Sequence, residues 1–163
     1  MMNTPVYLTA HAITSELGSG LQTHVDALLH PPAASPLSES GQWVRGKTYA
    51  FGAVNEALRP FPATLSDGHK SRNNQLLWHA LAQIEGDIEA AKQRFGAGRI
   101  AVVMGTSTSG VDENIPLFQQ VADGGAWRDV LFNQQQQILS APADFVADVY
   151  GLQGLCYGVS TAC

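Results

Sequence analysis

The stretch Gly154-Leu155-Cys156-Tyr157-Gly158-Val159-Ser160-Thr161-Ala162-Cys163 changes from apolar residues to small ones along its length. An apolar run that gives way to small residues is typical of a strand that enters a sharp turn. The stretch therefore predicts that Cys163 lies just past the carboxyl end of a strand, where a thiol can be exposed to a ligand.

The thiol of Cys163 could act as a nucleophile at such a position. A cysteine attacks as its thiolate, and a helix N-terminus directly after the strand would lower the pKa of the thiol. The same backbone amides can stabilise an oxyanion during acyl transfer, although that helix would lie beyond residue 163. Residue chemistry alone also permits a structural cysteine here, and both interpretations stay open.

A second strand is predicted earlier in the chain. The run Arg99–Gly105 is almost wholly apolar, which fits a strand of a parallel α/β sheet covered on both faces. It opens into the small-residue loop Thr106-Ser107-Thr108-Ser109-Gly110. Ligands of open α/β sheets bind at the carboxyl ends of strands, so we expect this loop to form a pocket wall. A plain strand-to-helix turn is the alternative.

The remaining elements follow from hydrophobic periodicity and from proline and glycine signals. The sequence predicts a buried strand at Val6–Ala10, a glycine-containing turn at 15–20, a helix at Leu21–His30, short surface strands between Gln42 and Pro62, a long amphipathic helix at Ser71–Phe95, and a helix from Pro142 to Tyr150 that Gly151 ends.

Composition excludes several classes of function. The chain has 163 residues, 45% of them hydrophobic, which suffices for the core of one α/β domain. A net charge of −5 with 14% charged residues is a poor match for a duplex nucleic acid. No apolar run reaches the roughly 20 residues of a membrane span, and no signal peptide is evident, so a cytoplasmic protein is expected.

Two cysteines are too few for a disulfide framework, and they lack the spaced partners of a zinc site. We expect no metal, and we expect Cys156 to pack as a small apolar residue in its strand. The histidines all precede Cys163, and we expect solvated or locally hydrogen-bonded side chains for them: they are His11, His24, His30, His69 and His79.

Several segments together resemble the β-ketoacyl-acyl carrier protein synthases, which are condensing enzymes of the thiolase superfamily. Gly158–Cys163 is similar to the approach to the family's acyl-accepting cysteine, and Val149–Gly154 is similar to its preceding "YGLxG". Ile100–Gly110 resembles the family's central strand and small-residue loop. Leu8-Thr9 with the turn to Gly18 resembles its opening strand, and Asp26–Leu29 resembles its first helix. The resemblance spans essentially the whole chain.

The resemblance implies an α/β, thiolase-like fold, a mixed sheet with flanking helices, of which residues 1–163 would form the N-terminal half, up to the nucleophile. It implies that Cys163 carries the acyl chain and that malonyl-carrier protein is then decarboxylated and condensed with it. The two histidines and the lysine that assist this step would lie downstream. Residues expected at the acyl pocket are Thr106, Ser107, Ser109, Val111, Phe132 and Ile138.

Thr9 is followed by Ala10-His11-Ala12, whereas the family's opening strand usually runs into Thr-Gly-x-Gly. This departure suggests a divergent branch of the family, such as one that serves polyene or other secondary metabolism.

The resemblance also implies the partners. Family members dimerise, so we expect a homodimer or a heterodimer with a second synthase-like subunit, with Phe132–Ala141 at the interface. Acyl carrier protein is acidic, and Lys70 and Arg72, with Lys47 as a further candidate, are the expected basic docking residues. No cofactor is expected, since the phosphopantetheine belongs to the carrier.

Two other functions are compatible with the sequence. A chain-length-factor-like subunit has the family's fold and pairs with a synthase without performing chemistry, but such subunits usually replace the cysteine that is present here at 163. A free-standing small α/β binding module fits the length, although a chain that ends at a reactive cysteine has an unusual boundary.

Overall fold

The structure is a computed structural model, and it describes residues 5–44 and 46–160. The chain divides into two compact units. The first comprises residues up to 58 together with 79–85, and the second comprises 59–78 and the chain from 86 onward. Cys163 lies outside the described residues.

The first unit is built from two small antiparallel ladders and a helix. The strands are β1 (Thr14–Ser15), β2 (Gly18–Ser19), β3 (Ser38–Ser40) and β4 (Tyr49–Phe51), and β1 pairs with β2 as β3 pairs with β4. The helix α1 spans Leu21–Leu29 and is followed by the two prolines that predicted its end. The predicted helix is therefore confirmed. Of the short strands predicted between Gln42 and Pro62, β4 is present, and its partner β3 precedes that range.

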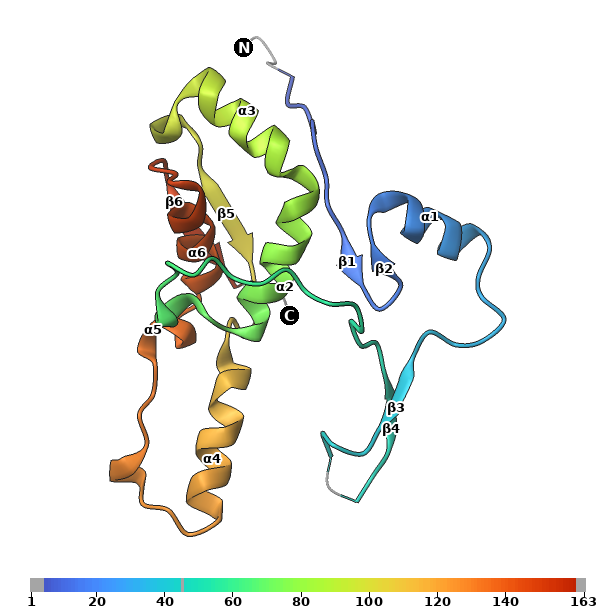
Figure 1. The fold of residues 1–163 in the computed structure, drawn as a ribbon, viewed down its shortest axis with the longest axis vertical. Helices are drawn as coiled ribbons and strands as arrows, with labels where there is room; N and C mark the ends of the chain where they lie inside the picture. The colour runs from blue at the N-terminus through green and yellow to red at the C-terminus, as the bar shows by residue number, and fades with distance from the viewer. Residues whose placement is uncertain (1–4, 45, 161–163) are drawn as a thin grey trace. The chain divides into compact units, whose positions relative to one another are not determined.

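The second unit contains most of the helices and one parallel pair of strands (Figure 1). Its regular elements are most of α2 (Arg72–Leu81), α3 (Glu85–Phe95), β5 (Val102–Gly105), α4 (Ile115–Ala122), α5 (Gln134–Gln137), α6 (Ala141–Tyr150) and β6 (Cys156–Val159), with one-turn 3-10 segments at Asp67–His69, Ala97–Arg99, Val111–Asn114 and Trp127–Asp129.

The core of the second unit forms around α6. Phe145 is fully buried, and its ring makes edge contacts with Phe61 and Trp78 at centroid distances of 5.9 and 6.2 Å. Pro142 lies in the first turn of α6, and Gly151 ends the helix in the left-handed conformation with φ 63°. Both end signals that predicted this helix are confirmed.

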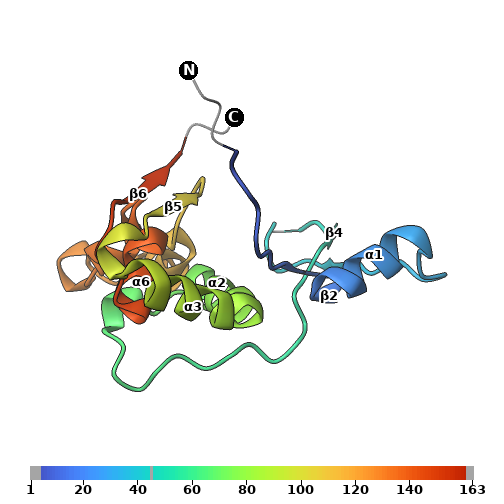
Figure 2. The ribbon, with the colours of Figure 1, turned by 90° about the horizontal axis from the view of Figure 1, so that it is seen from above.

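One face of the β5–β6 pair is covered. β5 and β6 pair in parallel from Val102↔Cys156 to Gly105↔Val159, and α6 contacts both strands (Figure 2). Val102 is buried, whereas Val103, Tyr157 and Val159 on the opposite face are exposed. The parallel pairing is as expected, but the prediction of cover on both faces is wrong for the described residues, which supply helices to one face.

The predicted strand at Val6–Ala10 is also wrong. These residues form no ladder, and the side chains of Val6 and Leu8 are 95% and 99% exposed. Strand patterning identifies apolar side chains that require a partner, and no other described strand pairs with this segment. The α/β class is nevertheless confirmed, and the strands of residues 5–44 and 46–160 form three two-stranded sheets.

The predicted long helix at Ser71–Phe95 is present as two helices. The 3-10 turn Ala82–Ile84 separates α2 from α3. Ser71 begins α2, because its hydroxyl oxygen accepts the N–H of Asn74 at 3.2 Å. Among the described residues, no helix has the length and apolar character needed to cross a membrane.

Candidate active site

The parallel pairing of β5 with β6 brings the carboxyl ends of both strands to one edge. The N–H of Thr106 donates to the carbonyl oxygen of Val159 at 3.1 Å, directly beyond the Gly105↔Val159 pair. The loop Thr106–Gly110 and Ser160 therefore leave the strands at the same edge. Cys163 follows Ser160 by three positions in the sequence, and its role as nucleophile stays a prediction.

The loop Thr106–Gly110 has a defined and unusual conformation. Ser109 is buried and adopts φ 52°, the left-handed region that residues with a side chain disfavour. Its N–H donates to Thr106 Oγ1 at 2.9 Å. A Cβ on Gly110 would lie 2.9 Å from the carbonyl oxygen of Gln136 and 3.0 Å from Ser71 Cβ, so glycine permits this close approach. The loop is thus more constrained than a plain connection.

The structure brings some of the six predicted pocket residues together and not others. Thr106 and Ser109 are hydrogen-bonded to each other, and Ser109 approaches the 132–141 segment at Gln136. The exposed residues are Ser107, Val111, Phe132 and Ile138. No contact joins these four to one cavity in the described part of the chain, so the acyl pocket stays a prediction.

Phe132 belongs to an aromatic cluster that the sequence interpretation missed. Its ring centroid lies 6.2 Å from that of Phe118 in α4, which in turn lies 5.9 Å from that of Trp127. The apolar spacing of Ile115, Phe118 and Ala122, with proline in the first turn, was the signal that could have identified α4.

The predicted docking residues lie beside acidic groups. Lys70 Nζ donates to Asp67 Oδ1 at 2.6 Å, and this hydrogen bond, with the positive charge of Lys70, lowers the pKa of the exposed Asp67 carboxyl group. The backbone N–H of Arg72 donates to Glu113 Oε1 at 2.7 Å. Lys47 is exposed in the other unit. The local charge around Lys70 and Arg72 is mixed, and carrier docking stays a prediction.

A cavity of about 310 Å³ lies elsewhere in the second unit, next to a histidine–carboxylate pair. His69 is 2% exposed, and its Nε2 lies 2.6 Å from Asp148 Oδ2. Nδ1 of His69 is buried and has no hydrogen-bond partner among the described residues. The cavity is lined by Pro62, Thr64, Leu65, Ser66, His69, Asp148 and Val149. No local pattern in the sequence marks this pair, because its members are 79 positions apart.

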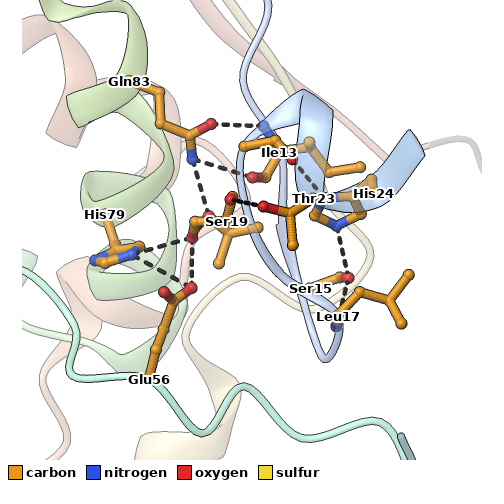
Figure 3. A network of polar contacts seen from close by, with 11 residues as sticks. Ile13, Ser15, Leu17, Ser19, Thr23, His24, Glu56, His79 and Gln83 are labelled. Carbon is orange, nitrogen blue, oxygen red and sulfur yellow. Dashed lines mark hydrogen bonds and ion pairs between the residues drawn. The ribbon is translucent and has the colours of Figure 1, made fainter. Parts of the chain in front are cut away.

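Two histidines of the first unit, His24 and His79, have hydrogen-bonded side chains, and His11 and His30 are exposed, as expected. Nε2 of the buried His24 lies 2.8 Å from Ser15 Oγ, and its Nδ1 lies 2.8 Å from the carbonyl oxygen of Gly20. His79 Nε2 lies 3.2 Å from Ser19 Oγ and 3.5 Å from Glu56 Oε1 (Figure 3). Ser19 Oγ also donates to Glu56 Oε1, so the hydroxyl and the carboxylate both approach Nε2 of His79. In a catalytic triad the hydroxyl and the carboxylate approach opposite ring nitrogens, so this arrangement is not that of a triad.

The side chain of Gln83 holds the strand β1 region in the same network. Its amide oxygen accepts the N–H of Ile13 at 3.3 Å, and its amide nitrogen donates to the carbonyl oxygen of Ile13 at 3.0 Å (Figure 3). The same amide nitrogen also donates to Thr14 Oγ1 at 3.2 Å, so Gln83 contacts the backbone of Ile13 and the side chain of the next residue. We therefore assign the network of the first unit a structural role.

Cys156 should react slowly with alkylating reagents. The pKa of its thiol is raised, first by burial and then by the carboxylate of Asp144, whose Oδ1 lies 3.7 Å from Sγ. A raised pKa keeps the thiol protonated at a pH where an unfolded cysteine begins to ionise, and the thiolate is the reactive form. Iodoacetamide labelling at pH 8, followed by peptide mass spectrometry, should show slower modification of Cys156 in the folded chain than in urea. Equal rates in both conditions would contradict this.

No protein-family model and no curated protein matches the sequence. The chain is similar to a solved structure of the ketosynthase ApeO in complex with its chain length factor ApeC from Xenorhabdus doucetiae, with 33% sequence identity and a TM-score of 0.83. The match covers 95% of this chain and 39% of the solved chain, so this chain spans about two fifths of that neighbour's length. Together with the α/β architecture, this similarity confirms the resemblance to condensing enzymes: the chain has a divergent ketosynthase-like fold.

Proposed function

We propose that these residues form the N-terminal part of a β-ketoacyl synthase in which Cys163 accepts the acyl chain. The observation that carries the proposal is the similarity to the ketosynthase and chain length factor complex over 95% of this chain, at 33% identity. The pairing of β5 with β6 supports it, because the small-residue loop and the run toward Cys163 start at one edge.

The proposed reaction has two stages. The Cys163 thiolate attacks the carbonyl carbon of an acyl thioester, a carbon–sulfur bond forms, and the carrier's phosphopantetheine thiolate leaves. The carbon–carboxylate bond of malonyl-carrier protein then breaks to release carbon dioxide. The resulting carbanion attacks the Cys163 thioester, and the Cys163 thiolate leaves as the new carbon–carbon bond forms. Dividing the reaction in this way lowers each barrier.

The activity requires groups that would follow Cys163 in the complete protein, according to the family resemblance. The proposal assigns decarboxylation to two histidines and a lysine downstream, and it assigns no metal or resident cofactor. We also propose a cytoplasmic protein. The product class, whether fatty acyl, polyene or polyketide, follows from the acyl groups that the complete pocket accepts.

The proposed partners are acyl carrier protein and a second synthase-like subunit. The solved neighbour is a complex of a ketosynthase with its chain length factor, which supports a heterodimer here. Exposed Phe132 and Ile138 support an interface at Phe132–Ala141. Lys70 and Arg72 are proposed to attract the acidic carrier despite the neighbouring Asp67 and Glu113.

A chain-length-factor-like subunit is the second candidate function. The similar structure contains a chain length factor as well as a ketosynthase. The family resemblance implies that both roles use one fold. Cys163 favours the catalytic role, because a subunit without chemistry has no need for the nucleophile.

Turnover by the full-length chain with its partner subunit tests the proposal. Acyl-loaded carrier and malonyl-carrier should give a β-ketoacyl product two carbons longer, detected by mass spectrometry. Absence of product would contradict catalysis.

The substitution Lys70→Glu or Arg72→Glu should raise the KM for the carrier about tenfold at low salt, because each reverses a charge that attracts the carrier. An unchanged KM would contradict docking at this surface.

The double substitution Phe132→Asp and Ile138→Asp should lower the native mass from that of a dimer to that of a monomer. An unchanged dimer mass would contradict the interface at Phe132–Ala141.

A further inference from the structure

Gln136, in the short helix α5, contacts two other segments of the second unit through its main chain and side chain. Its side-chain Nε2 donates to the carbonyl oxygens of Asp67 at 3.2 Å and Lys70 at 2.9 Å. Its own carbonyl oxygen accepts the N–H of Gly110 at 3.2 Å, and Ser109 Oγ lies 3.5 Å from the same oxygen. A single half-buried glutamine thus connects the 3-10 turn at Asp67–His69 to the Thr106–Gly110 loop.

The loop depends on these contacts for its conformation. Ser109 has φ 52°, and it is the one residue other than glycine with a positive φ in residues 5–44 and 46–160. Such a conformation persists where the surroundings hold it. Thr106 Oγ1, within the loop, accepts the N–H of Ser109. The carbonyl oxygen of Gln136, outside the loop, accepts the next N–H, that of Gly110.

The position of that carbonyl oxygen is in turn set by the Gln136 side chain. The helix α5 has only four residues, so it supplies little stability of its own. The two hydrogen bonds to Asp67 and Lys70 fix this short helix against the 3-10 turn Asp67–His69. The side chain of Asn133 caps α5 by accepting the N–H of Gln135. Gln135 also contacts His69 and Gln137 accepts from Asn114, so loss of the Gln136 side-chain donor would loosen the helix, and with it the carbonyl oxygen on which Gly110 depends, without detaching it.

We propose that Gln136 is a positioning residue for acyl transfer, which fixes the Thr106–Gly110 loop beside the edge where β6 leads to Cys163. The inference rests on the proposed function. Gln136 acts through the loop, so its effect falls on the rate at which a bound acyl group reacts. Carrier affinity is proposed to depend on the charged side chains of Lys70 and Arg72, whereas Gln136 contacts only the backbone carbonyl oxygen of Lys70, so the KM for the carrier should change little.

The test uses the full-length chain with its partner subunit and the variants Gln136→Glu and Gln136→Ala. Glutamate has nearly the same size, but its carboxylate cannot donate to the two carbonyl oxygens. Gln93→Ala is the matched control, because Gln93 is an exposed glutamine in a helix, α3, outside the proposed machinery. Both Gln136 variants should accelerate amide hydrogen exchange in peptides that cover residues 106–110 by about tenfold, while the Gln93 control leaves it unchanged.

Acyl loading of Cys163 supplies the second readout. The maximal loading rate should fall about tenfold in both Gln136 variants, with the KM for acyl-carrier protein unchanged within a factor of about two. A purely structural role would leave the loading rate unchanged once the folded fraction is taken into account, and that result would overturn the proposal. Faster exchange throughout the chain, without selectivity for residues 106–110, would overturn it as well.

The two hypotheses fail in different ways. If the wild-type chain accepts no acyl group while exchange in the loop still depends on Gln136, the proposed function fails, and the positioning role in acyl transfer falls with it. If the wild-type chain is acylated and neither Gln136 variant changes loop exchange or loading rate, the proposed function stands and the positioning role of Gln136 is wrong.

Discussion

Replacement of Cys163 with alanine is expected to abolish acyl loading of the full-length chain and to lower product formation by roughly 10⁴-fold or more. Alanine has no group that can form the thioester, so the acyl chain has no covalent site from which to meet the malonyl carbanion. Product formation is measured by mass spectrometry with acyl-loaded carrier and malonyl-carrier, in the presence of the partner subunit.

Cys156→Ala is the matched control for that experiment. Cys156 is half-buried at the start of β6 and contacts Asp144, and its raised pKa disfavours the thiolate at neutral pH. The Cys156 variant should therefore retain acyl loading. Undiminished turnover by Cys163→Ala, or loss of turnover confined to Cys156→Ala, would show that the nucleophile has been misassigned.

Replacement of Phe145 with alanine is expected to destabilise the chain by about 3–5 kcal/mol. Phe145 is fully buried, and its ring packs against Phe61, Trp78 and the imidazole of His69. Truncation removes the transfer free energy of the ring and leaves a cavity among aromatic side chains that cannot collapse freely. Urea denaturation of the full-length chain, followed by circular dichroism, measures the difference in unfolding free energy.

Phe95→Ala is the control for that substitution. Phe95 lies at the C-terminal end of α3 and is 52% exposed, so its truncation removes much less buried surface. Its expected cost is below about 1 kcal/mol. Equal destabilisation by the two alanine variants would contradict the assignment of the core around α6.

The helices α1 and α6 and the central strands could be predicted from the sequence because their signals are local, whereas α4 and α5 were not predicted. Pro142 and Gly151 define the ends of α6, and the apolar runs at 99–105 and 154–159 become the parallel pair β5 and β6. These signals depend on spacing within about ten residues, and no distant partner is needed to interpret them.

The N-terminal segment shows where local patterning fails. Val6–Ala10 has the composition of a buried strand, but a strand is stable only where another strand supplies hydrogen bonds and apolar cover. The described residues provide neither, and the side chains of Val6 and Leu8 stay exposed. One face of β5 and β6, with Val103 and Tyr157, is exposed for the same reason, because the described residues supply no apolar cover there.

Only part of the candidate site could be predicted, because the loop has a local signal and the contacts that hold it come from a distant residue. The small-residue loop after β5 was found from its sequence, and the pairing of Thr106 with Val159 confirms that it shares an edge with the end of β6. The contacts that fix the loop come from Gln136, which is 26 positions away from Gly110 in a run of polar residues. No periodicity marks one glutamine of such a run as different from its neighbours.

The most direct test of the proposed nucleophile is the intact mass of the full-length chain before and after incubation with acyl-loaded carrier protein. Fragmentation of the modified chain then locates the added group. The expected result is one acyl group in place of the thiol hydrogen of Cys163, removable with hydroxylamine as a thioester is. An unchanged mass, or an acyl group on any other residue, would contradict the proposal that Cys163 carries the acyl chain.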